Sequence, residues 1–206
     1  MERIYRDLAL DDIPWHAAVA PELLTNAVTT RAPRPRTVID LGCGAGNYVI
    51  TLSRMGFDVT GVDIAETAIE IARQSAWRAG VTCRYVAADV LGEPPAIVDR
   101  YDFAYDWELL HHILPEDRDR YLRTVYGLLN PSGTYLSVCF SEDDLQFGGV
   151  GKYRSTPLGT VLYFSSEEEI RALVAKRFVI DELKTIELRG QHGSHKAIYA
   201  LARKEL

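Results

Sequence analysis

The chain has 206 residues, of which 47% are hydrophobic and 25% charged, the proportions of one ordinary soluble globular domain. Its formal net charge of −6 argues against a broad phosphate-binding face, and therefore favours a small substrate over nucleic acid. No apolar run is long enough to cross a bilayer and the start, MERIYRDLALDD, lacks a signal-peptide pattern, so we expect no membrane association.

The three cysteines, Cys43, Cys83 and Cys139, stand far apart and have no CxxC spacing. They indicate neither a disulfide framework nor a zinc site, which fits a reducing cytoplasm. No repeat or low-complexity linker divides the chain. We expect a single domain over residues 1–206, with a helical cap at 1–36, that works as a monomer or homodimer.

Runs of strand length alternate with segments of helical period along most of the chain, a pattern typical of βαβ units and a parallel sheet. The expected elements are a helix around Trp15–Thr29, a strand at Thr37–Leu41, a helix at Tyr48–Arg54, a strand at Phe57–Asp63, a helix at Glu66–Ala79, strands at Cys83–Asp89 and Tyr101–Asp106, a helix at Pro115–Leu129 and a strand at Thr134–Phe140. After a further helix, strands at Phe178–Leu188 and His195–Arg203 predict an antiparallel hairpin at the sheet edge.

The irregular segment Ser141–Ser166 is too long for a plain connection, and loops of this length are usually lids or binding loops. Its glycines and its aromatic residues, among them Phe147 and Tyr153, predict an inserted lid that contacts the substrate. Trp15 either closes over a bound ligand or anchors the N-terminal segment.

A glycine loop, VIDLGCGAGN, joins the first expected strand to the first helix. Gly42, Gly44 and Gly46 permit tight turning and a close approach of ligand to backbone. Their spacing is G-x-G-x-G, whereas a dinucleotide fingerprint has G-x-G-x-x-G and so would need glycine at Asn47. Asp40, just before the loop, would repel a pyrophosphate and attract a sulfonium or ammonium group. The loop therefore favours S-adenosylmethionine over NAD.

Acids end the next strands along the chain. Asp63 can accept hydrogen bonds from both ribose hydroxyls, and Asp89 can accept one from an adenine amino group. Asp106 ends the fourth strand, and all four acids fall at carboxyl ends of strands, where open α/β sheets bind ligands. Any single one of them could instead be a helix cap.

Five stretches in order, DLGCGAGN, GVDIAETAIEIAR, AADV, YDFAYDWELLHHI and LLNPSGTYLSV, resemble the motifs of class I S-adenosylmethionine-dependent methyltransferases. The resemblance implies a doubly wound, seven-stranded, mostly parallel Rossmann-like α/β sheet and S-adenosylmethionine as cofactor. It implies these cofactor contacts: Asp40, Gly42, Gly44, Gly46 and Asn47 near the methionine part, with Asp106 and Trp107 at that edge, Asp63 and Ile64 at the ribose, and Asp89 and Val90 at the adenine.

Two further stretches suggest a narrower class. DDIPW, at Asp11–Trp15, and the strand–loop–helix pattern after Tyr101 resemble thiopurine, thiol and halide methyltransferases and the tellurite-resistance type. The (Asp/Asn)-Pro-Pro-Tyr tetrapeptide of enzymes that methylate amino groups on adenine or glutamine is absent. We therefore expect a small-molecule acceptor.

Glu108, His111 and His112 are the candidate catalytic residues. If Trp107–Leu114 is helical, Glu108 lies three and four residues before the histidines and can orient one imidazole. Adjacent helical residues point about 100° apart, so only one histidine can face the methyl group, and we favour His112 as a base. The alternative is that both histidines only shape the turn.

Three other functions compete with a small-molecule methyltransferase. An NAD-dependent oxidoreductase would need the missing glycine spacing. A non-catalytic module would bind the cofactor and transfer nothing. A methyltransferase acting on protein or RNA would share the cofactor site and differ in the acceptor. No residue spacing in the chain predicts a metal site.

Overall fold

The computed structural model describes residues 1–31, 33–92, 97–148, 150–190 and 193–205. The strands are β1 (Thr37–Leu41), β2 (Asp58–Asp63), β3 (Arg84–Ala87), β4 (Tyr101–Trp107), β5 (Leu129–Phe140), β6 (Tyr153–Ser155), β7 (Val161–Tyr163), β8 (Val179–Gly190) and β9 (Gly193–Arg203). The helices are α1 (Glu2–Asp7), α2 (Glu22–Thr29), α3 (Asn47–Arg54), α4 (Glu66–Arg78), α5 (Pro115–Leu128) and α6 (Glu167–Val174), with 3₁₀ turns η1 (Leu10–Asp12) and η2 (Leu110–His112). No helix in these ranges has the length and hydropathy needed to span a membrane.

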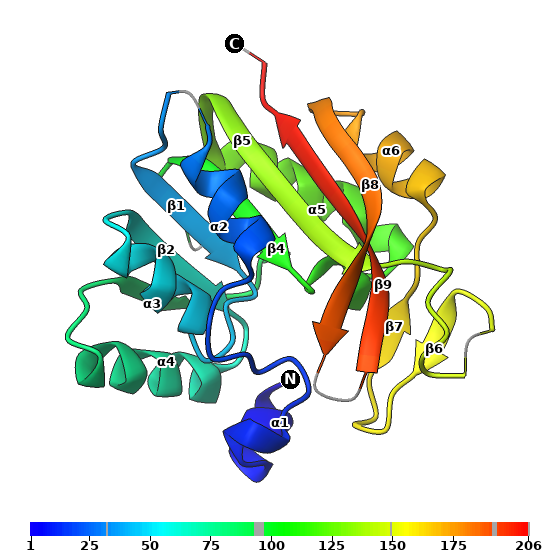
Figure 1. Ribbon diagram of the computed structural model, residues 1–206, viewed down its shortest axis with the longest axis horizontal. Coiled ribbons are helices and arrows are strands. Elements are labelled where there is room, and N and C mark those ends of the chain that lie inside the picture. Colours follow the sequence, from blue (N-terminus) through cyan, green and yellow to red (C-terminus); the bar gives the residue numbers. More distant parts are fainter. Residues whose placement is uncertain (32, 93–96, 149, 191–192, 206) are drawn as a thin grey trace.

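Seven strands form one sheet in the order β3-β2-β1-β4-β5-β9-β8 (Figure 1). The pairs from β3 to β5 are parallel, whereas β9 runs antiparallel to both β5 and β8. Within this register Asp40 lies beside Gly61 on one side and Tyr105 on the other. The expected doubly wound, mostly parallel α/β sheet with an antiparallel C-terminal hairpin is confirmed.

Both faces of the sheet are buried, because alternate residues of its central strands enter two different apolar clusters. Val38 and Phe103 pack on the face that α2, α3 and α4 cover, and Ile39 and Ala104 pack on the face that α5 and α6 cover. Figure 1 shows α2 in front of the sheet and α5 behind it. This two-sided burial explains why the strands read as nearly continuous apolar runs.

The N-terminal segment differs from expectation. The helix expected from Trp15 begins only at Glu22, directly after Pro21. Proline fixes its own φ and disfavours helical backbone at the residue before it, so a helix starts after it more readily than it continues through it. The unexpected helix α1 packs through Ile4 and Tyr5 against Ala65 and Ala68, which belong to α4 and its N-cap.

The segment 141–166 is a built unit containing the antiparallel ribbon β6–β7. Its centre is Arg154, which is 3% exposed and donates to the carbonyl oxygens of Glu142, Asp144, Gln146 and Gly151. The guanidinium carbon lies 3.9 Å from the centre of the Phe164 ring. These contacts hold the described part of the segment together from within.

Candidate functional site

A cleft of about 280 Å³ opens where β1, β2 and β4 end, above the glycine loop. We call it the main cleft. It is lined by all the expected cofactor-binding residues except Asp106, namely Asp40, Gly42, Gly44, Gly46, Asn47, Asp63, Ile64, Asp89, Val90 and Trp107. Among the residues that the structure describes, every one that lines it falls between Met1 and Ile113. The parallel register of the strands brings these distant segments to one edge.

The glycine loop forms the floor of the main cleft and has no room for side chains. Gly44 and Gly46 adopt positive φ values of 51° and 81°. A Cβ atom at Gly44 would lie 2.5 Å from the Tyr5 hydroxyl oxygen, and one at Gly46 would lie 2.5 Å from the Tyr85 hydroxyl oxygen. Glycine is therefore required here by backbone conformation and by space.

Asp63 ties the loop to the end of β2. Its Oδ2 accepts a hydrogen bond from the Gly44 amide and its Oδ1 one from the Ala65 amide, each at 2.9 Å. Burial raises the pKa of Asp63 above its usual value, although these amides oppose the shift. Each carboxylate oxygen keeps accepting capacity, so the side chain remains able to bind hydroxyl groups in the cleft.

Four carboxylates line the main cleft: Asp40, Asp63, Asp89 and Glu108. Burial raises the pKa of Asp40 to about 8, a shift that the nearby Tyr105 hydroxyl opposes. Asp89 is exposed and accepts from the Leu91 amide at 2.8 Å. The described residues contain no group of three His, Cys, Asp or Glu side chains placed to hold a metal ion.

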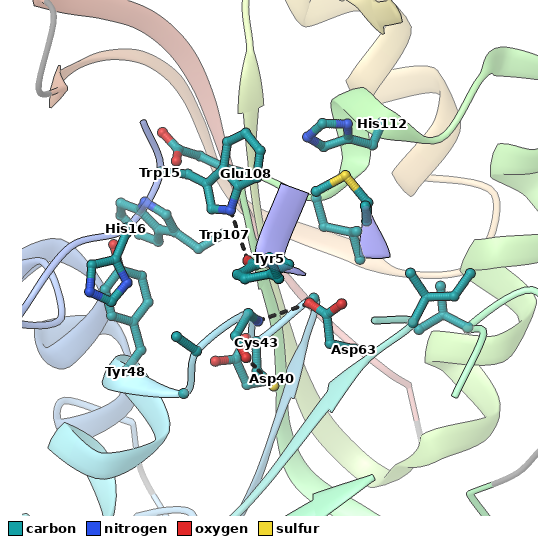
Figure 2. A pocket seen from close by; sticks show the side chains of 18 of the residues that line it. Tyr5, Trp15, His16, Asp40, Cys43, Tyr48, Asp63, Trp107, Glu108 and His112 are labelled. Atoms are coloured by element: carbon teal, nitrogen blue, oxygen red, sulfur yellow. Dashed lines mark hydrogen bonds between the residues drawn. The ribbon is translucent and has the colours of Figure 1, made fainter. Parts of the chain in front are cut away.

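The N-terminal segment covers the main cleft. Trp15 donates from its indole nitrogen to the Tyr5 hydroxyl at 2.8 Å, and its ring contacts His112 edge-on with centroids 6.2 Å apart (Figure 2). The Asn47 amide donates to the Ala17 carbonyl at 2.8 Å, which fastens this cover to the glycine loop. Trp15 thus lies where the sequence placed it. Tyr5 was missed because no local motif links it to a loop some 40 residues further along the chain.

Asp106 was expected to contact the cofactor, but its side chain does not reach the main cleft. β4 runs one residue further than expected, and Asp106 points to the same face as Ala104, toward α5. It is fully buried and accepts hydrogen bonds from three hydroxyl groups, those of Tyr121, Tyr135 and Ser137. Burial raises its pKa to about 6 although these donors lower it. Asp106 is a buried structural carboxyl in this fold.

The two histidines separate as expected, one toward the cleft and one away from it. His112 lines the main cleft, and burial lowers its pKa to about 4. His111 is 2% exposed and stacks on Phe140, whose amide donates to the His111 Nδ1 at 3.3 Å. Burial lowers the pKa of His111 as well. A buried ring that accepts a backbone amide and does not line the cleft is no candidate for proton transfer.

The expected pairing of Glu108 with a histidine is not present. Residues 107–114 are not a helix: Glu108 has a left-handed φ of 67°, and only Leu110–His112 form a 3₁₀ turn. Within the described chain no hydrogen bond or ion pair involves the Glu108 carboxylate, and Figure 2 shows it well apart from His112. Burial alone raises its pKa to about 7.

Arg118 organises the histidine turn instead. It is 4% exposed and donates to the carbonyl oxygens of Leu110 and Ile113 at 3.1 and 2.8 Å and to the Ser165 hydroxyl at 2.8 Å. These bonds satisfy carbonyl groups that a 3₁₀ turn leaves free. The position of Arg118 in the first turn of α5, shortly after the histidine turn, is the sequence feature that could have indicated this role.

Phe147 and Tyr153 do not line the main cleft, which corrects their expected contact with substrate. Phe147 packs in a small cluster with Phe140, Leu162 and Phe164. Tyr153 is 57% exposed and contacts Tyr163 edge-on with ring centroids 4.9 Å apart. Side chains of Tyr48 and Leu109, which the sequence did not single out, line the cleft instead.

Part of the chain is similar to known methyltransferases. Residues 38–133 match the family described as Methyltransferase domain. The ubiquinone biosynthesis O-methyltransferase of Bordetella avium (strain 197N) is 34% identical over 98 residues, which cover 48% of this chain and 40% of that protein. The chain thus spans less than half the length of that relative. The tRNA N(3)-methylcytidine methyltransferase Mettl2 of Drosophila melanogaster is 28% identical over 195 residues, covering 87% of this chain and 60% of that protein.

A solved structure extends the likeness to the whole fold. The 1,6-didemethyltoxoflavin-N1-methyltransferase of Burkholderia thailandensis, with bound 1,6-didemethyltoxoflavin and S-adenosylhomocysteine, superposes with a TM-score of 0.74. It is 25% identical and the match covers 95% of this chain and 82% of that one. The expected resemblance to class I S-adenosylmethionine-dependent methyltransferases is confirmed.

Proposed function

Since this chain carries an S-adenosylmethionine-dependent methyltransferase domain of the class I fold, we propose that it transfers a methyl group from S-adenosylmethionine to a small-molecule nucleophile. One observation carries the proposal. Asp40, the glycine loop, Asp63 and Asp89 converge on a single cleft at the carboxyl ends of three parallel strands.

The residues of the main cleft fit this cofactor. The carboxylate of Asp63 is held by two backbone amides in a position to accept ribose hydroxyls, and Asp89 and Val90 flank the space for adenine. Burial raises the pKa of Asp40 to about 8, and a sulfonium or ammonium group beside it would lower that pKa and favour the charged carboxylate. When bound, S-adenosylmethionine provides an electrophilic methyl group.

The protein's own contribution is to hold the acceptor in line with that methyl group and to exclude water. Trp15 and Tyr5 cover the cleft from the N-terminal side, and Trp107 and His112 close it from the end of β4. His112 has a pKa near 4, so it is a weak base at neutral pH. We propose that the uncharged His112 ring lines one side of the site where the acceptor binds.

The acceptor is a small molecule in this proposal, with RNA as the second candidate. The Drosophila relative, named for tRNA methylation, is the observation that favours RNA. Against it stands the net charge of −6, because binding to a phosphate backbone depends on clustered lysine and arginine residues. The three cysteines are free, so we place the reaction in a reducing cytoplasm, with the protein as a monomer or homodimer.

The test is transfer of labelled methyl from S-adenosylmethionine to a panel of thiols, phenols, amines and halides, run beside a cell lysate treated with protease or ribonuclease. We expect label in small molecules. Label confined to RNA or protein would overturn the small-molecule assignment, and S-adenosylhomocysteine binding without transfer to any acceptor would point to a non-catalytic module. Asp63→Ala should abolish transfer, whereas Glu70→Gln, an exposed change on α4, should leave it intact.

A further inference from the structure

The charge of the main cleft restricts what it can accept. Asp40, Asp63, Asp89 and Glu108 line it, and Met1 lines it as well. Burial, the largest influence, raises the pKa of Asp63 and lowers that of His112, and the Met1 amino group lowers both. Among the described residues, no lysine or arginine lines it. S-Adenosylmethionine has two cationic groups and one carboxylate, so its net charge of about +1 offsets only part of this negative charge. Burial raises the pKa of Asp40 to about 8 and that of Glu108 to about 7, so these two carry part of a negative charge near neutral pH, and the cleft disfavours anionic acceptors.

Resting on the methyl transfer proposed above, we propose that the acceptor is an amine and that the Glu108 carboxylate binds its nitrogen. Glu108 directly follows β4 and is anchored by its own amide, which donates to the Val138 carbonyl at 2.8 Å. Its carboxylate lines the cleft, where the described residues offer it no hydrogen-bond donor. The N–H groups of an amine supply the donors that this carboxylate lacks.

The backbone of Glu108 supports a role in binding. A residue with a side chain rarely adopts φ of 67°, and such strain persists where the surroundings hold it in place. Glycine would fill this turn at lower conformational cost, yet the chain has a glutamate. Burial, and after it the charge of Glu108, raises the pKa of the Tyr48 phenol. Tyr48 lines the same cleft, so its hydroxyl and the Glu108 carboxylate lie on one wall.

The movement of charge during transfer distinguishes an amine from other acceptors. An amine attacks as a neutral group and becomes positive as the sulfonium becomes neutral, so positive charge moves toward the acceptor. A carboxylate at the acceptor stabilises that charge in the transition state. A thiolate or phenolate instead begins negative and loses its charge, and nearby carboxylates raise the free energy of its bound form.

The reaction balances with groups already named. The nitrogen lone pair forms the new N–C bond while the methyl C–S bond breaks, and the electron pair of that bond stays on sulfur, giving S-adenosylhomocysteine. The methylated nitrogen is then cationic. The Glu108 carboxylate pairs with this cation, and the product leaves as a methylammonium that exchanges its proton with water.

Binding to the S-adenosylhomocysteine complex tests the assignment without requiring turnover. We would measure, by calorimetry, amines against alcohols, thiols and carboxylates on the same phenylethyl and indolylethyl skeletons. We expect amines to bind about 10- to 100-fold more tightly than the matched alcohols, the effect of a hydrogen bond to a charged group, and carboxylates not to bind. Amines that bind no better than the alcohols would overturn the proposal.

Variants of Glu108 separate this proposal from the cofactor site. Glu108→Gln should remove the preference for amines while the Kd for S-adenosylhomocysteine stays within about twofold, and Glu70→Gln should preserve both. Glu108→Gly, which relieves the left-handed strain, should behave like Glu108→Gln and rule out misfolding as the cause. If the methylated product carries its new group on oxygen or sulfur, the amine assignment falls and the methyltransferase function stands. If S-adenosylhomocysteine does not bind at all, the function itself falls.

Discussion

At the scale of single residues, Asp106 is a carboxyl with no access to the cleft. Two tyrosine hydroxyls and a serine hydroxyl donate to it, yet burial still raises its pKa to about 6. A raised pKa means that ionisation costs more in the folded state than in the unfolded chain. The contribution of Asp106 to stability is thus fully present below its unfolded pKa, near 3.8, and decreases as pH rises toward and through 6.

Asp106→Asn should remove this pH dependence. The free energy of unfolding of the wild type, relative to the variant, should fall by about 1–2 kcal/mol between pH 5 and pH 8. Asparagine can still accept from the tyrosines through its oxygen and donate toward Ser137 through its nitrogen, so we expect the variant to fold. Urea unfolding at several pH values measures the difference. A constant difference across that range would show that Asp106 is charged throughout.

Substitutions at Gly46 and Gly56 allow the cost of left-handed backbone to be measured separately from the cost of crowding. Both have positive φ, 81° and 88°, but a Cβ at Gly46 meets Tyr85 and Ala72 whereas one at Gly56 meets nothing within 4 Å. Gly56→Ala should cost about 1–2 kcal/mol of stability from left-handed strain alone. Gly46→Ala should cost about 1–3 kcal/mol more, from overpacking, and should weaken S-adenosylhomocysteine binding. Equal unfolding free energies for the two variants would contradict the crowding described for the loop.

At the scale of elements, the sequence predicted the sheet well because β-branched runs ended by glycine or acids mark parallel strands. It also predicted that most of the proposed cofactor-binding residues share one edge of the sheet, where they line the main cleft. It failed at Asp106 because β4 continues to Trp107, so Asp106 lies inside the strand and strand alternation places its side chain on the face covered by α5. It failed at Glu108 because a left-handed residue leaves no periodic signal, and at Tyr5 because its contact with Gly44 is long-range.

The N-terminal cover is an element with its own small core. Ile4, Tyr5 and Ile13 pack only with Ala65 and Ala68 among fully buried residues, apart from the two large clusters of the sheet. Few buried contacts mean a low free energy of local opening. In hydrogen exchange, amides of residues 2–17 should exchange quickly in the free protein and become protected when S-adenosylhomocysteine binds. Amides of α6, remote from the cleft, serve as the internal control, and equal protection of the cover in both states would exclude opening.

At the scale of the whole molecule, α3 and the end of β4 line the cleft and also belong to the core on one face of the sheet. Ligand binding should therefore stabilise the entire fold. At 100 times its Kd, S-adenosylhomocysteine should add about 2.7 kcal/mol and raise Tm by about 5–11 °C for a protein of this size. NADH should leave Tm unchanged. A shift with NADH and none with S-adenosylhomocysteine would favour the oxidoreductase alternative.

Of the residues that the structure describes, those lining the main cleft all fall between Met1 and Ile113, a division with consequences for how the protein evolves. Selection for the cofactor acts on this first part of the chain directly. From α5 onward, the helices, the β8–β9 hairpin and the β6–β7 ribbon are constrained by packing, so substitutions there drift faster as long as the sheet stays covered. Descendants of one ancestor can thus keep a common cofactor half while their C-terminal halves become unrecognisable to one another.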